Sequence, residues 1–357
     1  MANSNLTNAK RAKNDEFYTQ YLDIEKEVAA YLEYNPDVFR GKTILLPCDD
    51  PEWSNFTKFF AQNFERFGLK KLISTSYAAD SKTYKADYLP TLFETKDPKF
   101  DKKMTTKYGK IFTLTSDKTG DGKTDINDLE WHYLKGDGDF RSDEIKRLRD
   151  EADIIITNPP FSLFREFLAW IMEAKKSLLV IGNIHAIIYK EVFPFIKANK
   201  LWLGPSITSG DREFEVPEGI VDMDKFTGEV RNGKYYQKVV GVRWFTNLDH
   251  GRRHQRLPLM TMEDNLKYSK HEEIKGKKYE KYDNYDAIDV PYVDAIPSDY
   301  DGVMGVPVSL LDKFDPDQFE IVGSNRGVDQ DPDKVYGRGS HLNGKETFKR
   351  LFIRHKR

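Results

Sequence analysis

The sequence contains one cysteine, Cys48, so no disulfide can form within the chain. Single-cysteine chains are typical of reducing compartments, and we expect a cytoplasmic protein. No run of about 20 apolar residues occurs, so we predict no transmembrane helix and no membrane partner. Residues 1–14 are polar and lack the apolar core of a signal peptide, which argues against secretion. We expect this stretch to be a disordered tail.

The chain also lacks a surplus of positive charge, because it has 56 Lys and Arg but 58 Asp and Glu, which gives a formal net charge of −2. Many DNA-binding proteins are basic overall, but contact with DNA requires only a local cationic patch. The balance therefore leaves a nucleic-acid partner open. A length of 357 residues suits one large α/β domain carrying an inserted or appended module.

Short apolar runs alternate with amphipathic stretches along the first two thirds of the chain. This alternation is typical of an α/β protein with a doubly wound, mostly parallel sheet, whose ligands bind beyond the carboxyl ends of the strands. We expect helices over residues 15–34, 55–67 (ended by Gly68), 142–151, 163–174 and 192–199. We expect strands over residues 43–47, 69–74, 110–115, 131–134, 153–157, 178–182 and 239–248. Residues 336–354 suggest two further strands joined by a turn at Asn343-Gly344.

The strongest candidate for chemistry is Asn158-Pro159-Pro160-Phe161, directly after the buried strand 153–157. Two prolines stiffen the turn and remove two N–H donors, which favours carbonyl acceptors. The Asn158 amide oxygen and the Pro159 carbonyl could hold both protons of an exocyclic amine such as adenine N6, while Phe161 stacks on the base. Such a base must first leave its duplex. The alternative is an ordinary proline turn with a buried Phe.

Two further loops are candidates for a cofactor. The corner after the first strand comprises Pro47, Cys48, Asp49 and Asp50; it lacks a glycine-rich fingerprint and could equally cap the next helix. The second loop has the sequence GDGDF and contains Asp137, Asp139 and Phe140. Here we expect Asp139 to accept a hydrogen bond from an adenine amine and Phe140 to pack on the ring, in a loop beside the strand that leads to Asn158. A plain Gly/Asp turn is the alternative.

These segments resemble the EcoRI-type adenine-specific DNA methyltransferases. The resemblance rests on DEFYTQYLDIEKE (15–27), LLPCDDPEWSNF (45–56), GDGDFRS (136–142) and TNPPFSLFREF (157–167), and more weakly on RWFTNL (243–248) and DYDGVMGVP (299–307). It implies a Rossmann-like, seven-stranded methyltransferase sheet, S-adenosylmethionine as methyl donor and double-stranded DNA as substrate. It also implies a restriction-modification context with a cognate endonuclease, and Phe17, Tyr18 and Thr19 as an N-terminal cofactor motif. The second strand ends Ser74-Thr75-Ser76-Tyr77, without the acidic residue that usually holds the cofactor ribose.

This interpretation divides the chain into a catalytic domain, residues 15–205, and a region 206–357 that holds the remaining strands, a target-recognition region and a C-terminal hairpin. We expect a monomer. The basic residues Arg252, Arg253 and Arg256 could contact DNA phosphates, or form a solvated loop. Methylation of an RNA adenine or a protein glutamine stays open as an alternative activity.

Two other motifs are decoys. The acidic stretch 117–128 departs from a calcium loop at Thr124 and Asp128, so we predict no metal site. The stretch 339–346 has Glu346 where a phosphate-binding loop needs Ser or Thr. His185 after a buried strand is expected to be structural.

Overall fold

The computed structural model describes residues 19–47, 49–51, 54–78, 97–208, 212–216, 228–327, 331 and 333–356. The predicted tail 1–14 and the candidate residues Phe17, Tyr18 and Cys48 lie outside these residues. The chain forms two compact units, one of Met1–Ile184 with Ser209–Leu248, the other of His185–Thr208 with Asp249–Arg357. We predict a single boundary after residue 205. In this division the chain instead passes between the units three times, after residues 184, 208 and 248.

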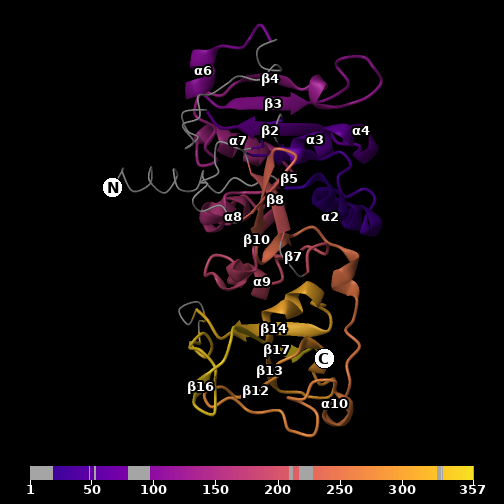
Figure 1. The fold of residues 1–357 in the computed structure, drawn as a ribbon, viewed down its shortest axis with the longest axis vertical. Coiled ribbons are helices and arrows are strands. Elements are labelled where there is room, and N and C mark those ends of the chain that lie inside the picture. Colours follow the sequence, from indigo (N-terminus) through magenta and orange to yellow (C-terminus); the bar gives the residue numbers. More distant parts are fainter. Residues whose placement is uncertain are drawn as a thin grey trace, which may run out of the picture. The chain divides into compact units, whose positions relative to one another are not determined.

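A large sheet organises the first unit (Figure 1). Its strands are β1 (Thr43–Leu46), β2 (Lys71–Ser76), β3 (Lys110–Leu114), β4 (Glu130–Tyr133), β5 (Ile154–Thr157), β6 (Ser177–Asn183) and β11 (Val242–Thr246). Together with β7 (Trp202–Leu203), the order is β4-β3-β2-β1-β5-β6-β11-β7, eight strands against our predicted seven. The pairs β2–β1, β1–β5 and β5–β6 are parallel, whereas β3 runs antiparallel to β2 and β4, and β11 runs antiparallel to β6. The prediction of an α/β fold with a large, mostly parallel sheet is confirmed.

The helices of this unit begin and end at residues whose chemistry explains them. They are α2 (Tyr21–Tyr34), α3 (Asn55–Gln62), α4 (Phe64–Phe67), α6 (Lys102–Lys107), α7 (Asp143–Glu151) and α8 (Phe164–Glu173), with short 3-10 turns η3 (Ile126–Asp128) and η4 (Phe161–Leu163). Ser54 and Ser142 are the N-caps of α3 and α7, each accepting from backbone N–H groups of the first turn. Gly68 ends α4 in the left-handed region at φ 62°, as the sequence predicts.

Strand order brings two loops to one place. The chain runs from β1 outward to β2 and later returns to the other side of β1 as β5, so the connections diverge between β1 and β5. At such a divergence, loops after adjacent parallel strands separate and leave room for a ligand at the carboxyl edge. Those loops are the Pro47–Asp50 corner and the Asn158–Phe161 corner.

Two smaller features complete the first unit. A three-stranded antiparallel sheet has the order β8-β10-β9, with β8 (Arg212–Val216), β9 (Glu229–Arg231) and β10 (Lys234–Val239). The turn between β9 and β10 uses Asn232 and Gly233, both at positive φ. In the large sheet, Gly182 on β6 allows close packing of α8, since a Cβ there would lie 2.4 Å from the Phe164 ring.

The second unit is built on a four-stranded sheet of order β12-β13-β17-β14. Its elements are η5 (Ile184–Ile188, which begins in the first unit), α9 (Phe193–Lys197), β7, η7 (Gly251–His254), α10 (Met262–Tyr268), β12 (Ala287–Asp289), η8 (Val293–Ala295), β13 (Val303–Pro307), η9 (Val308–Lys313), β14 (Phe319–Ser324), β15 (His341–Leu342), β16 (Lys345–Glu346) and β17 (Arg350–His355). Tyr282, Tyr285 and Phe352 form an aromatic core on this sheet.

The predicted C-terminal hairpin is partly wrong. Asn343 and Gly344 do form the turn, at φ 50° and 75°, but the hairpin comprises only the two-residue strands β15 and β16. Beyond it, β17 pairs instead with β13 and β14. In the part of the chain that the structure describes, no helix is both long and apolar enough to cross a membrane.

Candidate active site

The Asn158–Phe161 corner follows a strand whose four residues are all buried. Pro159 and Pro160 are buried, while Asn158 and Phe161 are half-buried. The Pro160 carbonyl accepts from the backbone N–H of Leu163 at 2.9 Å, which starts η4 directly after the prolines. The corner is therefore stiff, with its two chemically distinctive side chains at the boundary between protein and solvent.

One hydrogen bond joins this corner to the predicted cofactor corner. The Thr157 hydroxyl donates to the Pro47 carbonyl at 3.1 Å, across 110 positions of sequence. At the other end of the same strands, the Asp153 carboxylate accepts from the Thr43 N–H at 2.8 Å. The ends of β1 and β5 are thus fixed to each other, and the two loops open from one shared point.

The Asp49 corner also supports the next helix. The Ser54 hydroxyl donates to the Asp49 carboxylate at 2.8 Å and accepts from two N–H groups of α3. The Asp49 carbonyl accepts from the Thr57 hydroxyl at 3.0 Å. Ser54 is the N-cap of this helix and Asp49 orients it, so the corner also serves to open the helix, as the alternative interpretation expects.

Thr19 lies at this same corner. Its carbonyl accepts from the side-chain amide of Asn55, the first residue of α3, at 2.7 Å. Its side chain is 4% exposed, and among the described residues its hydroxyl oxygen has no hydrogen-bond partner. A buried hydroxyl without a partner is costly in a folded protein, so this atom suits a polar ligand group.

The GDGDF loop packs on the end of β2. Gly138 lies at φ 89°, and a Cβ there would approach the Ser76 carbonyl oxygen to 2.5 Å. The Ala78 N–H donates to the Asp137 carbonyl at 2.9 Å. Our expectation that this loop lies beside the strand leading to Asn158 is corrected here, since β1 separates β2 from β5. The loop still faces the same carboxyl edge of the sheet.

Within that loop, Asp139 and Phe140 already have protein partners. Arg141 donates to both Asp139 oxygens, at 2.8 and 2.6 Å, and its third guanidinium nitrogen, Nη1, lies 3.6 Å from Glu166 on α8. The Asp139 carboxylate raises the pKa of Arg141. Phe140 is 1% exposed and packs edge-on against Phe167 of α8. In this conformation the Phe140 ring fixes the loop to α8 and offers no open face to a ligand.

The predicted DNA-contacting arginines have three different environments. Arg253 is 6% exposed, donates to Asp249 and Asn199, and lies 3.5 Å above the Trp202 ring centre. These contacts hold Arg253 within the fold, so a phosphate contact by this residue stays a prediction. Arg252 is half-buried and donates to the Pro205 carbonyl at 2.8 Å, whereas Arg256 is exposed.

The decoy motifs fold as loops that use their own carboxylates. Asp117 accepts from the N–H groups of Gly120 and Gly122, and Asp128 accepts from three backbone N–H groups. Although burial acts to raise it, these donors lower the pKa of Asp128 to about 2. Among the described residues, no His, Cys, Asp and Glu side chains cluster as metal ligands. Glu346, in the phosphate-loop decoy, pairs with Arg326 at 2.5 Å.

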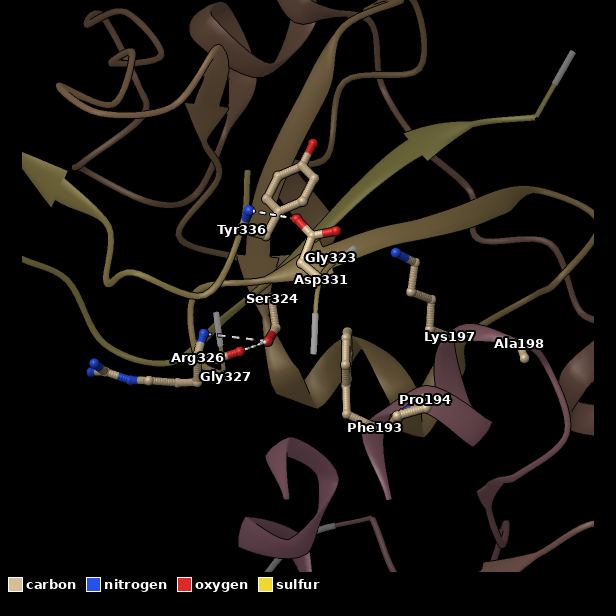
Figure 2. Close-up of a pocket in the computed structure, with 10 residues that line it drawn as sticks. All are labelled: Phe193, Pro194, Lys197, Ala198, Gly323, Ser324, Arg326, Gly327, Asp331 and Tyr336. Carbon is tan, nitrogen blue, oxygen red and sulfur yellow. Dashed lines mark hydrogen bonds between the residues drawn. The ribbon is translucent and has the colours of Figure 1, made fainter. Parts of the chain in front are cut away.

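The second unit contains a pocket of about 370 Å³ that sequence analysis did not suggest (Figure 2). Its lining residues are Phe193, Pro194, Lys197, Ala198, Gly323, Ser324, Arg326, Gly327, Asp331 and Tyr336. The Asp331 carboxylate accepts from the N–H groups of Val335 and Tyr336, each at 2.8 Å. The Ser324 hydroxyl is bonded to the backbone of Arg326. Since these polar groups hold their own loops, we assign the pocket no ligand.

Sequence reasoning missed Thr157, Ser54, Asn55 and Arg141, which hold the candidate site together. A serine just before an apolar periodic stretch is a recognisable helix start, so Ser54 could have been found. Thr157 and Asn55 bond to residues 110 and 36 positions away, and nothing local in sequence marks such partners.

Comparisons with known proteins give one consistent result. Residues 5–356 match the model of a family described as "Adenine-specific methyltransferase EcoRI". The chain is 41% identical to the type II methyltransferase M.EcoRI of Escherichia coli, over 99% of this chain and 97% of that protein. It is 33% identical to M.MpnI of Mycoplasma pneumoniae and 35% identical to M.MgeORF184P of Mycoplasma genitalium, each over 88% of this chain and 83% or 84% of the relative. No solved structure matches.

Proposed function

Because the chain belongs to the EcoRI family of adenine-specific methyltransferases, we propose that it methylates N6 of a flipped adenine at a specific site in duplex DNA. The type II methyltransferase names of its relatives support DNA as the substrate and a restriction-modification system as the context. A cognate endonuclease, a monomeric state and a cytoplasmic location complete the proposal, together with a doubly wound methyltransferase sheet.

The observation that carries the proposal is the shared point at the ends of β1 and β5. Thr157 and Pro47 bond there, so the Asn158–Phe161 corner and the Asp49 corner open at one divergence of the sheet. A methyl transferase must present a donor and an acceptor to each other, and this edge provides one loop for each.

Asn158, Pro159, Pro160 and Phe161 are the proposed catalytic corner. The adenine N6 lone pair is delocalised into the ring, so the amine needs help to become a nucleophile. The Asn158 amide oxygen and the Pro159 carbonyl accept hydrogen bonds from its two N–H groups, which favours a tetrahedral nitrogen with its lone pair exposed. Phe161 stacks on the base face, and Pro160 keeps the acceptors at fixed separation. The adenine must first be flipped out of the double helix, because its N6 amine cannot be reached inside a duplex.

S-adenosylmethionine is the proposed methyl donor; its sulfonium supplies an electrophilic methyl group. The Thr19 hydroxyl, buried and without a partner among the residues that the structure describes, and the acidic Asp49 corner suit a polar, cationic ligand. Asp50 and Pro47 belong to the same corner, and Asp137 and Asp139 lie in the loop after β4, which packs on the end of β2. Phe17, Tyr18 and Cys48 enter through the family resemblance alone, and the buried Phe140 holds the loop in place.

Methyl transfer from labelled S-adenosylmethionine tests the proposal. Incubation with genomic duplex DNA should place label in N6-methyladenine after enzymatic digestion, and sequencing of the modified bases should reveal one target sequence. Label that enters RNA or a glutamine-containing protein, with unlabelled DNA, would establish the alternative activity.

A further inference from the structure

The small β8-β10-β9 sheet joins the rest of the first unit at the carboxyl edge of the large sheet. Two residues after β10, β11 begins at Val242, which pairs with Asn183 at the end of β6. The Ile184 N–H donates to the Gly241 carbonyl at 2.7 Å, and the Asn183 amide donates to the Val240 carbonyl at 2.9 Å. The base of the small sheet is therefore fixed to the ends of the strands, within one compact unit.

This base lies near the proposed catalytic corner. β6 separates β11 from β5, the strand that ends at Thr157 directly before Asn158. Thr157 pairs with Val180 on β6, so β5 and β6 end at the same edge of the sheet. Neighbouring strands are about 4.8 Å apart, which puts the start of β11 roughly 10 Å from the end of β5. A duplex whose adenine reaches Asn158 must therefore pass close to the small sheet.

The β9–β10 hairpin is narrow and exposed at its tip. Arg231 pairs directly with Lys234, so only Asn232 and Gly233 form the turn, at φ 51° and 76°. Residues 229–234 are all exposed. The six residues of β10 span about 20 Å, which exceeds the width of about 12 Å of the DNA major groove. The hairpin therefore has the shape of the two-stranded ribbon that this groove admits.

Ion pairs connect the tip of the hairpin to β8. Arg231 pairs with Glu213 of β8, and its guanidinium carbon lies 4.2 Å from the centre of the Tyr236 ring. Lys234, on the other side of the turn, pairs with Glu215 of β8 at 2.9 Å. Exposed ion pairs add little stability individually, but these two connect both sides of the turn to the neighbouring strand. The hairpin is therefore held in one direction.

The charge of the small sheet is nearly balanced. Its described residues, 212–216 and 228–240, contain four Lys or Arg and three Glu, a net charge of +1. Each Glu contacts a cation, since Glu229 lies 3.8 Å from Arg231 and the other two form the pairs with β8. Such a surface attracts phosphates only weakly. Its tip instead presents Glu, Arg, Asn and Lys, which are residue types that hydrogen-bond to base edges in the major groove.

Two exposed valines lie on the same hairpin. Val230 on β9 is 54% exposed, and Val240, at the base of the hairpin, is 69% exposed. An apolar side chain in the major groove can contact the methyl group of thymine. The hairpin therefore presents donors, acceptors and apolar groups, the kinds of contact that distinguish one base pair from another.

We infer that the β9–β10 hairpin enters the major groove beside the extruded adenine and reads the neighbouring base pairs. The inference rests on the proposed function, because it takes duplex DNA as the substrate. Asn232 and Lys234 at the tip contact base edges, and Arg231 positions the tip through its pair with Glu213. The hairpin therefore contributes to sequence specificity more than to overall affinity.

Asn232→Gly combined with Lys234→Ala removes both tip side chains and keeps the turn, since glycine adopts positive φ without strain. The substrates are synthetic duplexes with the target sequence, as identified by sequencing of modified bases, and with each of its single base-pair changes. The wild type should prefer the target by roughly tenfold to hundredfold in kcat/KM at each position that is read. The variant should methylate the target roughly tenfold more slowly and should lose its preference, to within about threefold, at only about two adjacent positions.

Asn343→Gly combined with Lys345→Ala is the matched control. Asn343, Gly344 and Lys345 repeat the residues of the tip at a second turn, with φ 50° and 75° at the first two. This variant should keep the wild-type rate and the wild-type preference at every position. Lys234→Ala alone, which leaves the residues of the turn unchanged, should relax the preference at a single position.

Three outcomes overturn the inference: an unchanged preference in the hairpin variants, an equal loss at every position, or the same relaxation in the control. Wild-type protein that methylates no DNA would instead refute the proposed function.

Discussion

The Asn158 corner and the Phe348 corner are both rigid, but they present different chemical groups. Two buried prolines stiffen the first, and it presents neutral oxygen acceptors at the boundary of a packed sheet. The buried Asn325 stiffens the second, between β16 and β17, by donating to the Phe348 carbonyl, and the Phe348 side chain is 86% exposed. An acceptor site for a single amine needs exact spacing and little charge. The two corners therefore present different groups to solvent, hydrogen-bond acceptors at the first and an apolar ring at the second.

The largest expected effect comes from breaking the first corner. Asn158→Ala should lower turnover at least a hundredfold, the range seen when one transition-state acceptor is removed. Single-turnover methylation and a DNA-binding assay measure the two properties separately, and DNA affinity should be nearly unchanged. Ser162→Ala, an exposed neighbour in η4, is the control and should retain full turnover. Unchanged turnover in Asn158→Ala would refute the catalytic assignment.

A second change tests whether the edge of the sheet depends on the GDGDF loop. Gly138→Ala should destabilise the protein by about 2 kcal/mol, because a Cβ meets the Ser76 carbonyl oxygen and φ is positive. Urea unfolding gives the free energy. Gly136→Ala in the same loop is the control, since nothing lies within 4 Å of its Cβ position. Equal stability of the two variants would show that the loop does not pack on β2 as described.

Acid should weaken the second unit. His250 is 2% exposed and bonded to the Leu203 carbonyl at 3.0 Å; burial lowers its pKa to about 4, with Arg253 acting in the same direction. Between pH 6.5 and 4 the unfolded chain binds a proton that the folded chain does not, so stability present at neutral pH is lost on acidification. The loss from pH 7 to pH 5 should be about 2 kcal/mol, measured by urea unfolding. His250→Asn should flatten this dependence, and an unaltered slope in that variant would exclude His250 as the cause.

The smallest effect should sharpen the comparison at the second corner. Phe348→Ala should change the free energy of unfolding by less than about 0.5 kcal/mol in urea, because an exposed ring has little burial to lose. Phe352→Ala, in the aromatic core of the same unit, is the contrasting control and should cost about 3 kcal/mol or more. A loss above about 1 kcal/mol in Phe348→Ala would contradict the exposure of its ring.

The sequence predicted local structure well where one segment contained the whole reason for it. DIIIT is short, apolar and bounded by a proline turn, and it is the buried strand β5. Gly68 ends its helix in the left-handed region, which glycine adopts without strain, so the residue type alone predicts the helix end. The candidate corners could be named for the same reason, since each lies directly after a strand.

Contacts between residues distant in sequence could not be foreseen. Arg253 belongs to an evident basic cluster, but Trp202 and Asn199, about fifty residues earlier, take its guanidinium into the interior. The packing of Phe140 against Phe167 could not be foreseen either, because Phe167 belongs to a later helix. The division into two units, which the chain passes between three times, likewise depends on contacts between segments far apart in sequence. Phe348 was not singled out from the sequence, because the sequence does not show which side chains are exposed to solvent.

The three crossings between the units also affect the order in which the nascent chain can complete the first unit. Strand β11 is synthesised after residues 185–208 of the second unit, although it pairs directly with β6. A nascent chain that ends before Val242 therefore leaves one edge of β6 unpaired, and an open strand edge favours aggregation. Domains usually fold one after another during synthesis, but here the large sheet must wait for a strand that follows part of the other unit.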